Sequence, residues 1–63
     1  MKTKTRQFDN GWSAMLEKLP SGLYLANVRR ANGDLHDKIR CDDKQSAADY
    51  YRAFCAIART AGA

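Results

Sequence analysis

A histidine and two cysteines are the residues of this sequence with the widest range of chemistry. His36 is the only histidine, and Cys41 and Cys55 are the only cysteines. A histidine can activate a thiol as a nucleophile, and cysteines and histidines are the usual ligands of zinc. A conventional zinc site needs four ligands, however, and His36 and Cys41 are expected to point to opposite faces of one strand. We therefore predict two buried reduced thiols, no metal, no cofactor and no enzymatic activity.

The basic residues offer a second kind of chemistry, which is the binding of an anionic partner. The 63 residues carry a net charge of +4, and three of the eleven cations are Lys2, Lys4 and Arg6. Residues 8–63 therefore hold eight basic and seven acidic groups and are nearly neutral. An anionic partner then requires positive charge to be segregated on one surface. We expect residues 1–7 to be a flexible basic tail and residues 8–63 to be a single small domain.

Two turn signals predict the sheet that would position the remaining basic residues. In the run Leu19-Pro20-Ser21-Gly22, Pro20 suits a type I turn and Gly22 suits the left-handed position of a three-residue loop. This loop pairs Leu19 with Leu23, Leu16 with Ala26 and Ala14 with Val28.

The second signal is Asn32-Gly33, a preferred pair for a two-residue type I′ turn. It pairs Arg30 with Leu35, Val28 with Asp37 and Tyr24 with Cys41. Both turns then predict one apolar face, formed by Trp12, Ala14, Leu16, Tyr24, Ala26, Val28, Leu35, Ile39 and Cys41.

A helix is predicted after Asp42, where the apolar period changes. Asp42 and Gln45 have the spacing of a capping box. Apolar residues then recur at helical spacing, namely Ala47, Tyr50 or Tyr51, Phe54, Ile57 or Ala58, and Ala61. The predicted fold class is α+β, with a three-stranded antiparallel sheet packed against one C-terminal helix in the order β-β-β-α.

The face of the sheet opposite the predicted core is the main candidate for a binding site. Its basic residues are Arg29, Lys38 and Arg40, with Asn27 and His36 beside them. A sheet can enter the major groove of DNA, where arginine reads guanine and asparagine reads adenine. The leading hypothesis is a small phage or mobile-element protein that binds double-stranded DNA, with Lys2, Lys4 and Arg6 on the DNA backbone.

Apolar residues on the same face support an alternative. Four apolar side chains are predicted to lie there, namely Met15, Leu19, Leu23 and Leu25. Such a patch suits a contact with a host or phage protein, or the seam of a homodimer. A third interpretation is an ordinary solvated face of a one-sided sheet.

Residues 12–58 resemble the DNA-binding module of phage and transposon integrase arm-binding domains and of Apetala-type plant regulators. The matching positions are Gly22, Tyr24, Ala26, Val28, Arg29, Gly33, Lys38, Arg40, Ala47, Ala48 and Tyr51. The resemblance implies a three-stranded sheet plus a helix, with Arg29, Lys38 and Arg40 as DNA contacts.

Two further resemblances concern the protein-binding alternative. The segment SAMLEKLPSGLYLANV resembles the opening hairpin of HicB-type antitoxins. In size and class the chain is also similar to phage-encoded inhibitors of host defence such as anti-CRISPR proteins. The sequence has no signal-peptide pattern and no apolar run as long as a membrane span, so we expect a cytoplasmic protein without membrane contact.

Overall fold

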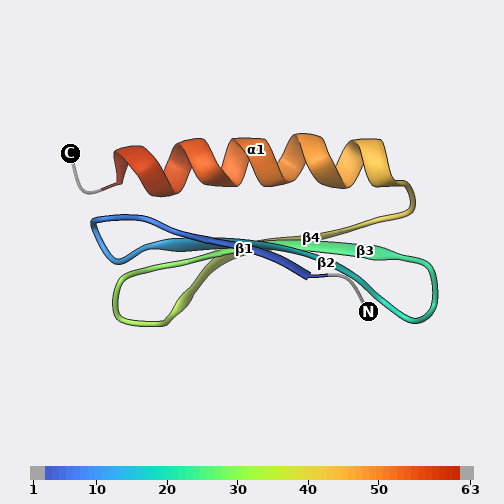
Figure 1. Ribbon diagram of the computed structural model, residues 1–63, viewed down its shortest axis with the longest axis horizontal. Helices are drawn as coiled ribbons and strands as arrows, with labels where there is room; N and C mark the ends of the chain where they lie inside the picture. The colour runs from blue at the N-terminus through green and yellow to red at the C-terminus, as the bar shows by residue number, and fades with distance from the viewer. Residues whose placement is uncertain (1–2, 62–63) are drawn as a thin grey trace.

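The computed structural model describes residues 3–61, which form an antiparallel sheet and one helix (Figure 1). In chain order the elements are β1 (Thr3–Gln7), β2 (Ser13–Lys18), β3 (Tyr24–Arg29), β4 (Leu35–Cys41) and α1 (Lys44–Thr60). The strands lie in the order β1-β2-β3-β4, so each one pairs with its neighbour in sequence. The predicted antiparallel sheet with one C-terminal helix is confirmed, but the sheet has four strands and not three.

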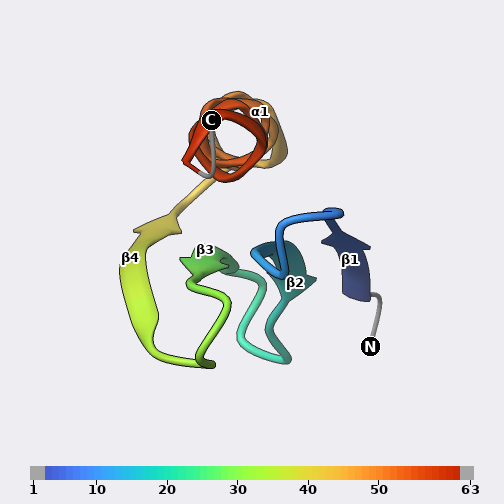
Figure 2. The same ribbon diagram turned by 90° about the vertical axis from the view of Figure 1, so that its left-hand side faces the viewer.

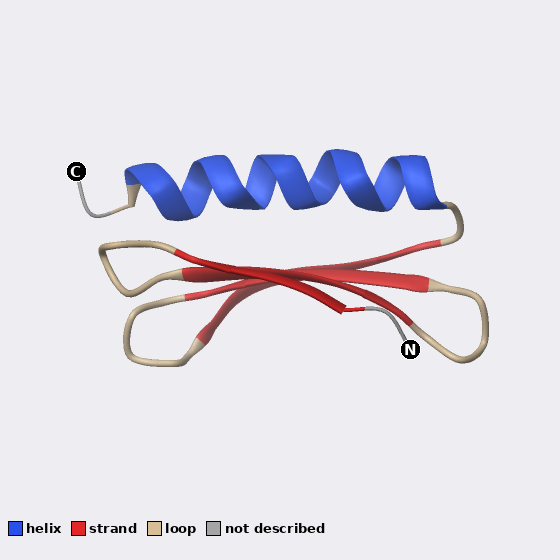
Figure 3. Ribbon diagram, in the orientation of Figure 1, coloured by secondary structure: helices blue, strands red, loops and turns tan. Residues whose placement is uncertain are grey.

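The helix divides the sheet into two different faces. α1 lies along one face, here called the inner face, and the other, outer face is left uncovered (Figures 2 and 3). Ala14, Ala26 and Val28 are fully buried beneath α1, so the residues that alternate with them in β2 and β3 belong to the outer face.

The additional strand, β1, replaces most of the predicted flexible tail. It pairs with β2 so that Lys4 lies opposite Leu16 and Arg6 opposite Ala14. The connection from β1 to β2 is a tight turn between Phe8 and Trp12, with the Phe8 amide donating to the Trp12 carbonyl at 2.9 Å. The prediction of a tail over residues 1–7 is therefore wrong for residues 3–7, since this turn brings them alongside β2.

All three hairpins are closed by the same three-residue turn. In each, the amide of the first residue donates to the carbonyl four residues later, over 2.8–2.9 Å, at Phe8–Trp12, Leu19–Leu23 and Arg30–Asp34. The last residue inside each turn is a glycine with φ near +90°, namely Gly11, Gly22 and Gly33. Glycine adopts this left-handed conformation without the steric cost that a side chain would add. The predicted Leu19–Leu23 loop is confirmed.

The turn between β3 and β4 differs from its prediction. A type I′ turn needs positive φ at both central residues, whereas among residues 3–61 only glycines have positive φ. The three-residue turn places Leu35 opposite Arg29, and a bulge then shifts the register so that Val28 lies opposite Asp37. Because of that shift, Ile39 and Cys41 still lie opposite Ala26 and Tyr24, as predicted. Leu35 is not a core residue, and its side chain is 42% exposed.

The core is small and is built largely from short side chains. Alanines on both layers are buried, Ala14 and Ala26 in the sheet and Ala47 and Ala58 in α1. Small residues let the helix approach the sheet closely, and Phe54 supplies the one buried aromatic ring within residues 3–61. The core is bordered by partly buried side chains of Phe8, Trp12, Leu16, Ile39 and Tyr51.

The start of α1 also differs from the predicted capping box. The N-cap is Asp43, in extended conformation, and its side chain makes no capping hydrogen bond. Asp42 therefore lies one residue before the cap. Of the alternatives along the helix, Tyr51 and Ala58 face the core, whereas Tyr50 and Ile57 are exposed.

Candidate nucleic-acid interface

Three cations predicted to bind DNA lie together on the outer face of β3 and β4. Lys38 is opposite Asn27, and Arg40 is opposite Leu25, so both share a face with the outward residues of β3. Arg29 lies on the same face, nearer to the turn between the two strands. All three side chains are exposed, and α1 lies on the other side of the sheet (Figure 2). We call Arg29, Lys38 and Arg40 the outer-face cations.

The outer-face cations are not neutralised by direct carboxylate contacts. Within residues 3–61 the ion pair that forms is between Arg52 and Asp49, both exposed on α1. Arg29 donates a hydrogen bond from its guanidinium to the Gly33 carbonyl oxygen at 3.1 Å, which fixes its direction without using its charge. Asp37 lies opposite Val28, in register with an inner-face residue. Positive charge is therefore segregated on this part of the sheet, although the body of the chain is nearly neutral.

Asn27 is not available as a base-reading side chain. It was predicted to assist the cations, but it is only 5% exposed. It lies on the central part of the sheet between Met15 of β2 and Lys38 of β4, which are its register partners. Longer neighbours on both strands bury it, although no helix covers this face.

His36 also does not join the outer-face cations, beside which it was predicted to lie. Its ring makes an edge-on contact with Trp12, with 5.2 Å between ring centroids. Its Nδ1 atom is 3.4 Å from the Nε atom of Arg30, which donates to it. The β4 bulge breaks the alternation in this region, and this is why counting from the turn misplaced the side chain.

Two of the N-terminal cations, Lys4 and Arg6, are held by β1 and do not form a free arm. Lys4 and Arg6 are opposite Leu16 and Ala14, which are inner-face residues, so their side chains leave the sheet on the helix side. The guanidinium carbon of Arg6 lies 5.2 Å from the centroid of the Phe8 ring. Neither residue joins the outer-face cations, and Lys2 lies outside the described residues.

The apolar residues of the alternative hypothesis are half-buried. Met15 and Leu25 lie on the outer face, opposite Asn27 and Glu17 respectively. Leu19 and Leu23 flank the turn between β2 and β3 and are hydrogen-bonded to each other through the backbone. Glu17 lies among them as an outer-face carboxylate, so this half of the face is apolar and weakly acidic whereas the β4 half is basic.

The thiols are placed as predicted, since Cys41 and Cys55 are both free and buried. Burial raises the pKa of the Cys41 thiol, and the nearby carboxylates of Asp43 and Asp42 raise it further. A buried thiol that stays protonated at neutral pH is a poor nucleophile. Within residues 3–61, no three histidine, cysteine or acidic side chains come together as ligands for a metal ion.

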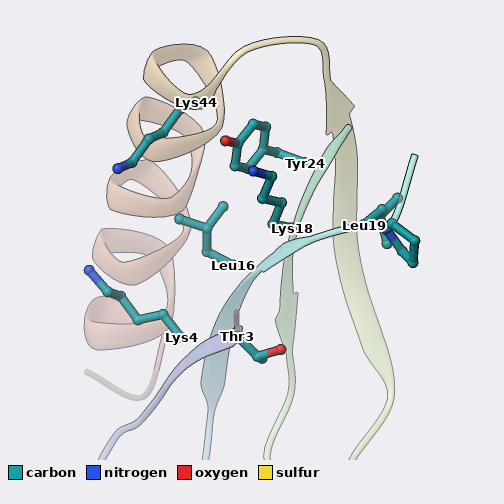
Figure 4. Close-up of a pocket in the computed structure, with 8 residues that line it drawn as sticks. Thr3, Lys4, Leu16, Lys18, Leu19, Tyr24 and Lys44 are labelled. Atoms are coloured by element: carbon teal, nitrogen blue, oxygen red, sulfur yellow. The ribbon is translucent and has the colours of Figure 1, made fainter. Parts of the chain in front are cut away.

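One cluster of cations was not found by reasoning from the sequence. Lys4 of β1, Lys18 of β2 and Lys44 of α1 line an open groove at the end of the sheet where α1 begins (Figure 4). The three lysines are far apart in the chain. Only the four-stranded topology brings them together, because β1 is needed to place Lys4.

No protein-family model matches this chain, and neither the curated proteins nor the solved structures include a match to it. Of the part of the chain that the structure describes, α1 is the one helix, and it is not long and apolar enough to cross a membrane.

Proposed function

We propose that this protein binds double-stranded DNA through the outer face of its sheet. The observation that carries the proposal is the exposed row of Arg29, Lys38 and Arg40 on two neighbouring strands, none of which forms an ion pair within residues 3–61. Phosphate contacts by arginine and lysine supply most of the affinity of non-specific DNA binding. Such a role suits a small phage or mobile-element protein.

The geometry limits the kind of binding that is expected. Asn27 is buried and His36 contacts Trp12, so the side chains left for base edges are arginines and one lysine. Arginine reads guanine in the major groove, but three long cations can equally contact phosphates. We therefore expect salt-sensitive binding with modest sequence preference.

The test is a fluorescence-anisotropy titration of mixed-sequence duplex DNA at 50 and 200 mM NaCl. Three phosphate contacts predict a loss of affinity of roughly 40-fold between these concentrations, since log K falls with log salt by about 0.9 per contact. The test variant is the double substitution Lys38→Ala and Arg40→Ala, which should bind at least about tenfold more weakly and with a reduced salt slope.

A matched control removes the same amount of charge from another surface. The double substitution Arg52→Ala and Arg59→Ala takes two positive charges from the exposed side of α1. If both double variants lose the same affinity, net charge and not the outer face is responsible, and the proposal fails. Absence of binding by the wild-type protein at 50 mM NaCl would also refute it.

A second candidate function is protein binding through the apolar half of the same face. The observation that favours it is the presence of Met15 and Leu25 on a face that no helix covers. A non-enzymatic inhibitor, similar in kind to an antitoxin or an anti-CRISPR protein, would use these residues, and so would a homodimer. For the homodimer, the test is sedimentation velocity, where Leu25→Asp should convert a wild-type dimer into a monomer. A wild-type protein that sediments as a monomer at 100 μM would exclude it.

A further inference from the structure

The open groove at the helix-start end of the sheet has the size and lining of a ligand site. Its volume is about 1050 Å³, just above the range of about 300–1,000 Å³ that is usual for small-molecule sites. Its walls come from β1, β2, β3, the β2–β3 turn and the first residue of α1 (Figure 4). We call this space the lysine groove.

The charge of the lysine groove is all of one sign. Lys4, Lys18 and Lys44 line it, and none of its described lining residues is acidic. None of the three takes part in an ion pair among residues 3–61. Like charges gathered without counter-charges repel one another, so an anion with several charges would bind here more favourably than a single carboxylate.

The remainder of the lining is mainly apolar. Figure 4 shows Leu16 between the side chains of Lys4 and Lys44 and Leu19 at the far end of the groove, and Pro20, the next residue in the chain, also lines the groove. The ammonium group of Lys18 lies 5.9 Å from the centroid of the Tyr24 ring, which also lines the groove. Clustered cations beside an apolar wall suit a ligand with phosphates at one end and an organic ring system at the other.

We propose that the lysine groove binds a nucleoside polyphosphate, with its phosphates among Lys4, Lys18 and Lys44 and its nucleoside against Leu19 and Pro20. Lysine ammonium groups are common phosphate ligands and act as point charges. This site lies on the helix side of the sheet and does not include the outer-face cations, so it is separate from the proposed DNA interface.

The experiment is an NMR titration of the ¹⁵N-labelled full-length protein with ATP in low salt, following backbone amide shifts. We expect saturable shifts centred on residues 16–20 and 44. Adenosine should produce no saturable shifts at the same concentrations, and tripolyphosphate should bind several-fold more weakly than ATP. Equal affinity for tripolyphosphate would overturn the nucleoside contact, and absence of saturable shifts with millimolar ATP would overturn the site.

Single charge-removing variants locate the phosphates. Lys18→Gln and Lys44→Gln alter exposed side chains and should each raise the dissociation constant for ATP about fivefold. The matched control is Arg59→Gln, which removes one exposed positive charge near the other end of α1 and should change it less than twofold. An equal effect of Arg59→Gln would show non-specific attraction and refute the proposal.

Two further arms separate this ligand from DNA. The Lys38→Ala and Arg40→Ala double variant should keep its affinity for ATP, so the groove can be tested even if the outer face does not bind DNA. A 5′-phosphorylated trinucleotide that shifts the same amides at lower concentrations than ATP would overturn the free nucleotide as the ligand and assign the groove to nucleic-acid ends.

Discussion

Gly11 is the most constrained of the three turn glycines. All three have φ of 90–92°, but they differ in what surrounds them. A Cβ atom added at Gly11 would lie 2.8 Å from the Cβ atom of Ala31, whereas one added at Gly22 would meet nothing within 4 Å. The two turns that flank β2 therefore differ in packing although their backbones are alike.

This difference predicts unequal costs for two similar substitutions. Gly22→Ala should destabilise the protein by about 1 kcal/mol, which is the usual cost of left-handed backbone for a non-glycine residue. Gly11→Ala should cost about 1–3 kcal/mol more, because Ala31 or the turn must move to accept the methyl group. Urea unfolding of the two variants provides the measurement, and equal midpoints would show that the contact with Ala31 is easily relieved.

The raised pKa values of the Cys41 thiol and the Tyr51 hydroxyl predict how stability depends on pH at the alkaline end. Burial raises the pKa of Cys41 above its ordinary value of 9.0. Burial also raises that of Tyr51 above 10.0, with Cys55 adding to the effect and Arg6 opposing it. In the unfolded chain both groups lose their protons at lower pH than in the folded protein. The contribution of these two groups to the free energy of unfolding should therefore be fully present below about pH 9 and be lost as the pH rises through the folded pKa values.

Thermal unfolding at pH 7.5 and at pH 10.5 measures this loss. Tyr51→Phe removes the tyrosine proton and keeps the ring, so its melting temperature should fall less between the two pH values than that of the wild-type protein. The same fall in both proteins would mean that Tyr51 does not contribute.

At the scale of elements, one side chain joins the first turn to the end of the helix. The side-chain Nδ2 of Asn10 donates to the Ala58 carbonyl oxygen at 2.7 Å, and the side-chain Oδ1 of Asn10 accepts from the backbone amide of Trp12 at 3.0 Å. Asn32 holds the same position in the third turn and accepts from the Asp34 amide at 3.0 Å, but it makes no hydrogen bond to α1.

Because Asn10 and Asn32 hold equivalent positions, substituting each of them measures how much the hydrogen bond from Asn10 to α1 contributes to stability. Asn10→Ala should destabilise the protein by about 1 kcal/mol more than Asn32→Ala, since only Asn10 satisfies a carbonyl at the end of α1. Amide exchange near residue 58 should rise only in the Asn10 variant. If the two variants have the same stability, the hydrogen bond to Ala58 contributes no net free energy.

At the scale of the whole molecule, stability depends on very few large side chains. The fully buried residues are mostly alanines, with Val28 the largest of those described, and Phe54 fills the space between α1 and the sheet. Proteins are stable by about 0.05–0.15 kcal/mol per residue, which gives roughly 3–9 kcal/mol for this chain. A single large cavity can therefore remove most of the folding free energy.

Phe54→Ala is accordingly expected to leave the chain largely unfolded at 25 °C, since such truncations cost about 3–5 kcal/mol. The control is Tyr50→Ala, one turn earlier on α1, where the side chain is 44% exposed and the expected cost is below about 1 kcal/mol. Circular dichroism with urea titration distinguishes the two. Cooperative unfolding of Phe54→Ala with a near wild-type midpoint would contradict this account of the core.

Much of the fold could be predicted because its determinants are local. The Pro20 and Gly22 turn, the alternation of β2 and β3 and the helical period after Asp43 are properties of short segments, and the structure confirms each of them. The first turn had a usable local signal as well, since Asp9-Asn10-Gly11 resembles the other turns and its glycine precedes Gly22 by eleven residues. Had that signal been used, β1 would have been predicted.

The candidate site was predictable only in part. Arg29, Lys38 and Arg40 share a face as predicted, because the β-bulge restores the register that the three-residue turn alone would have shifted by one residue. His36 was misplaced because a β-bulge is not visible in one segment. Asn27 lies on the predicted face but is buried there, which one segment does not show either.

The sequence by itself determined the turn glycines and the strand and helix periods, since each depends on residues a few positions apart. Only the tertiary structure decided that residues 3–7 join the sheet, that Leu35 is exposed and that three distant lysines line one groove. The physical reason is that pairing β1 with β2 and packing α1 across the sheet bring together side chains with no regular spacing along the chain.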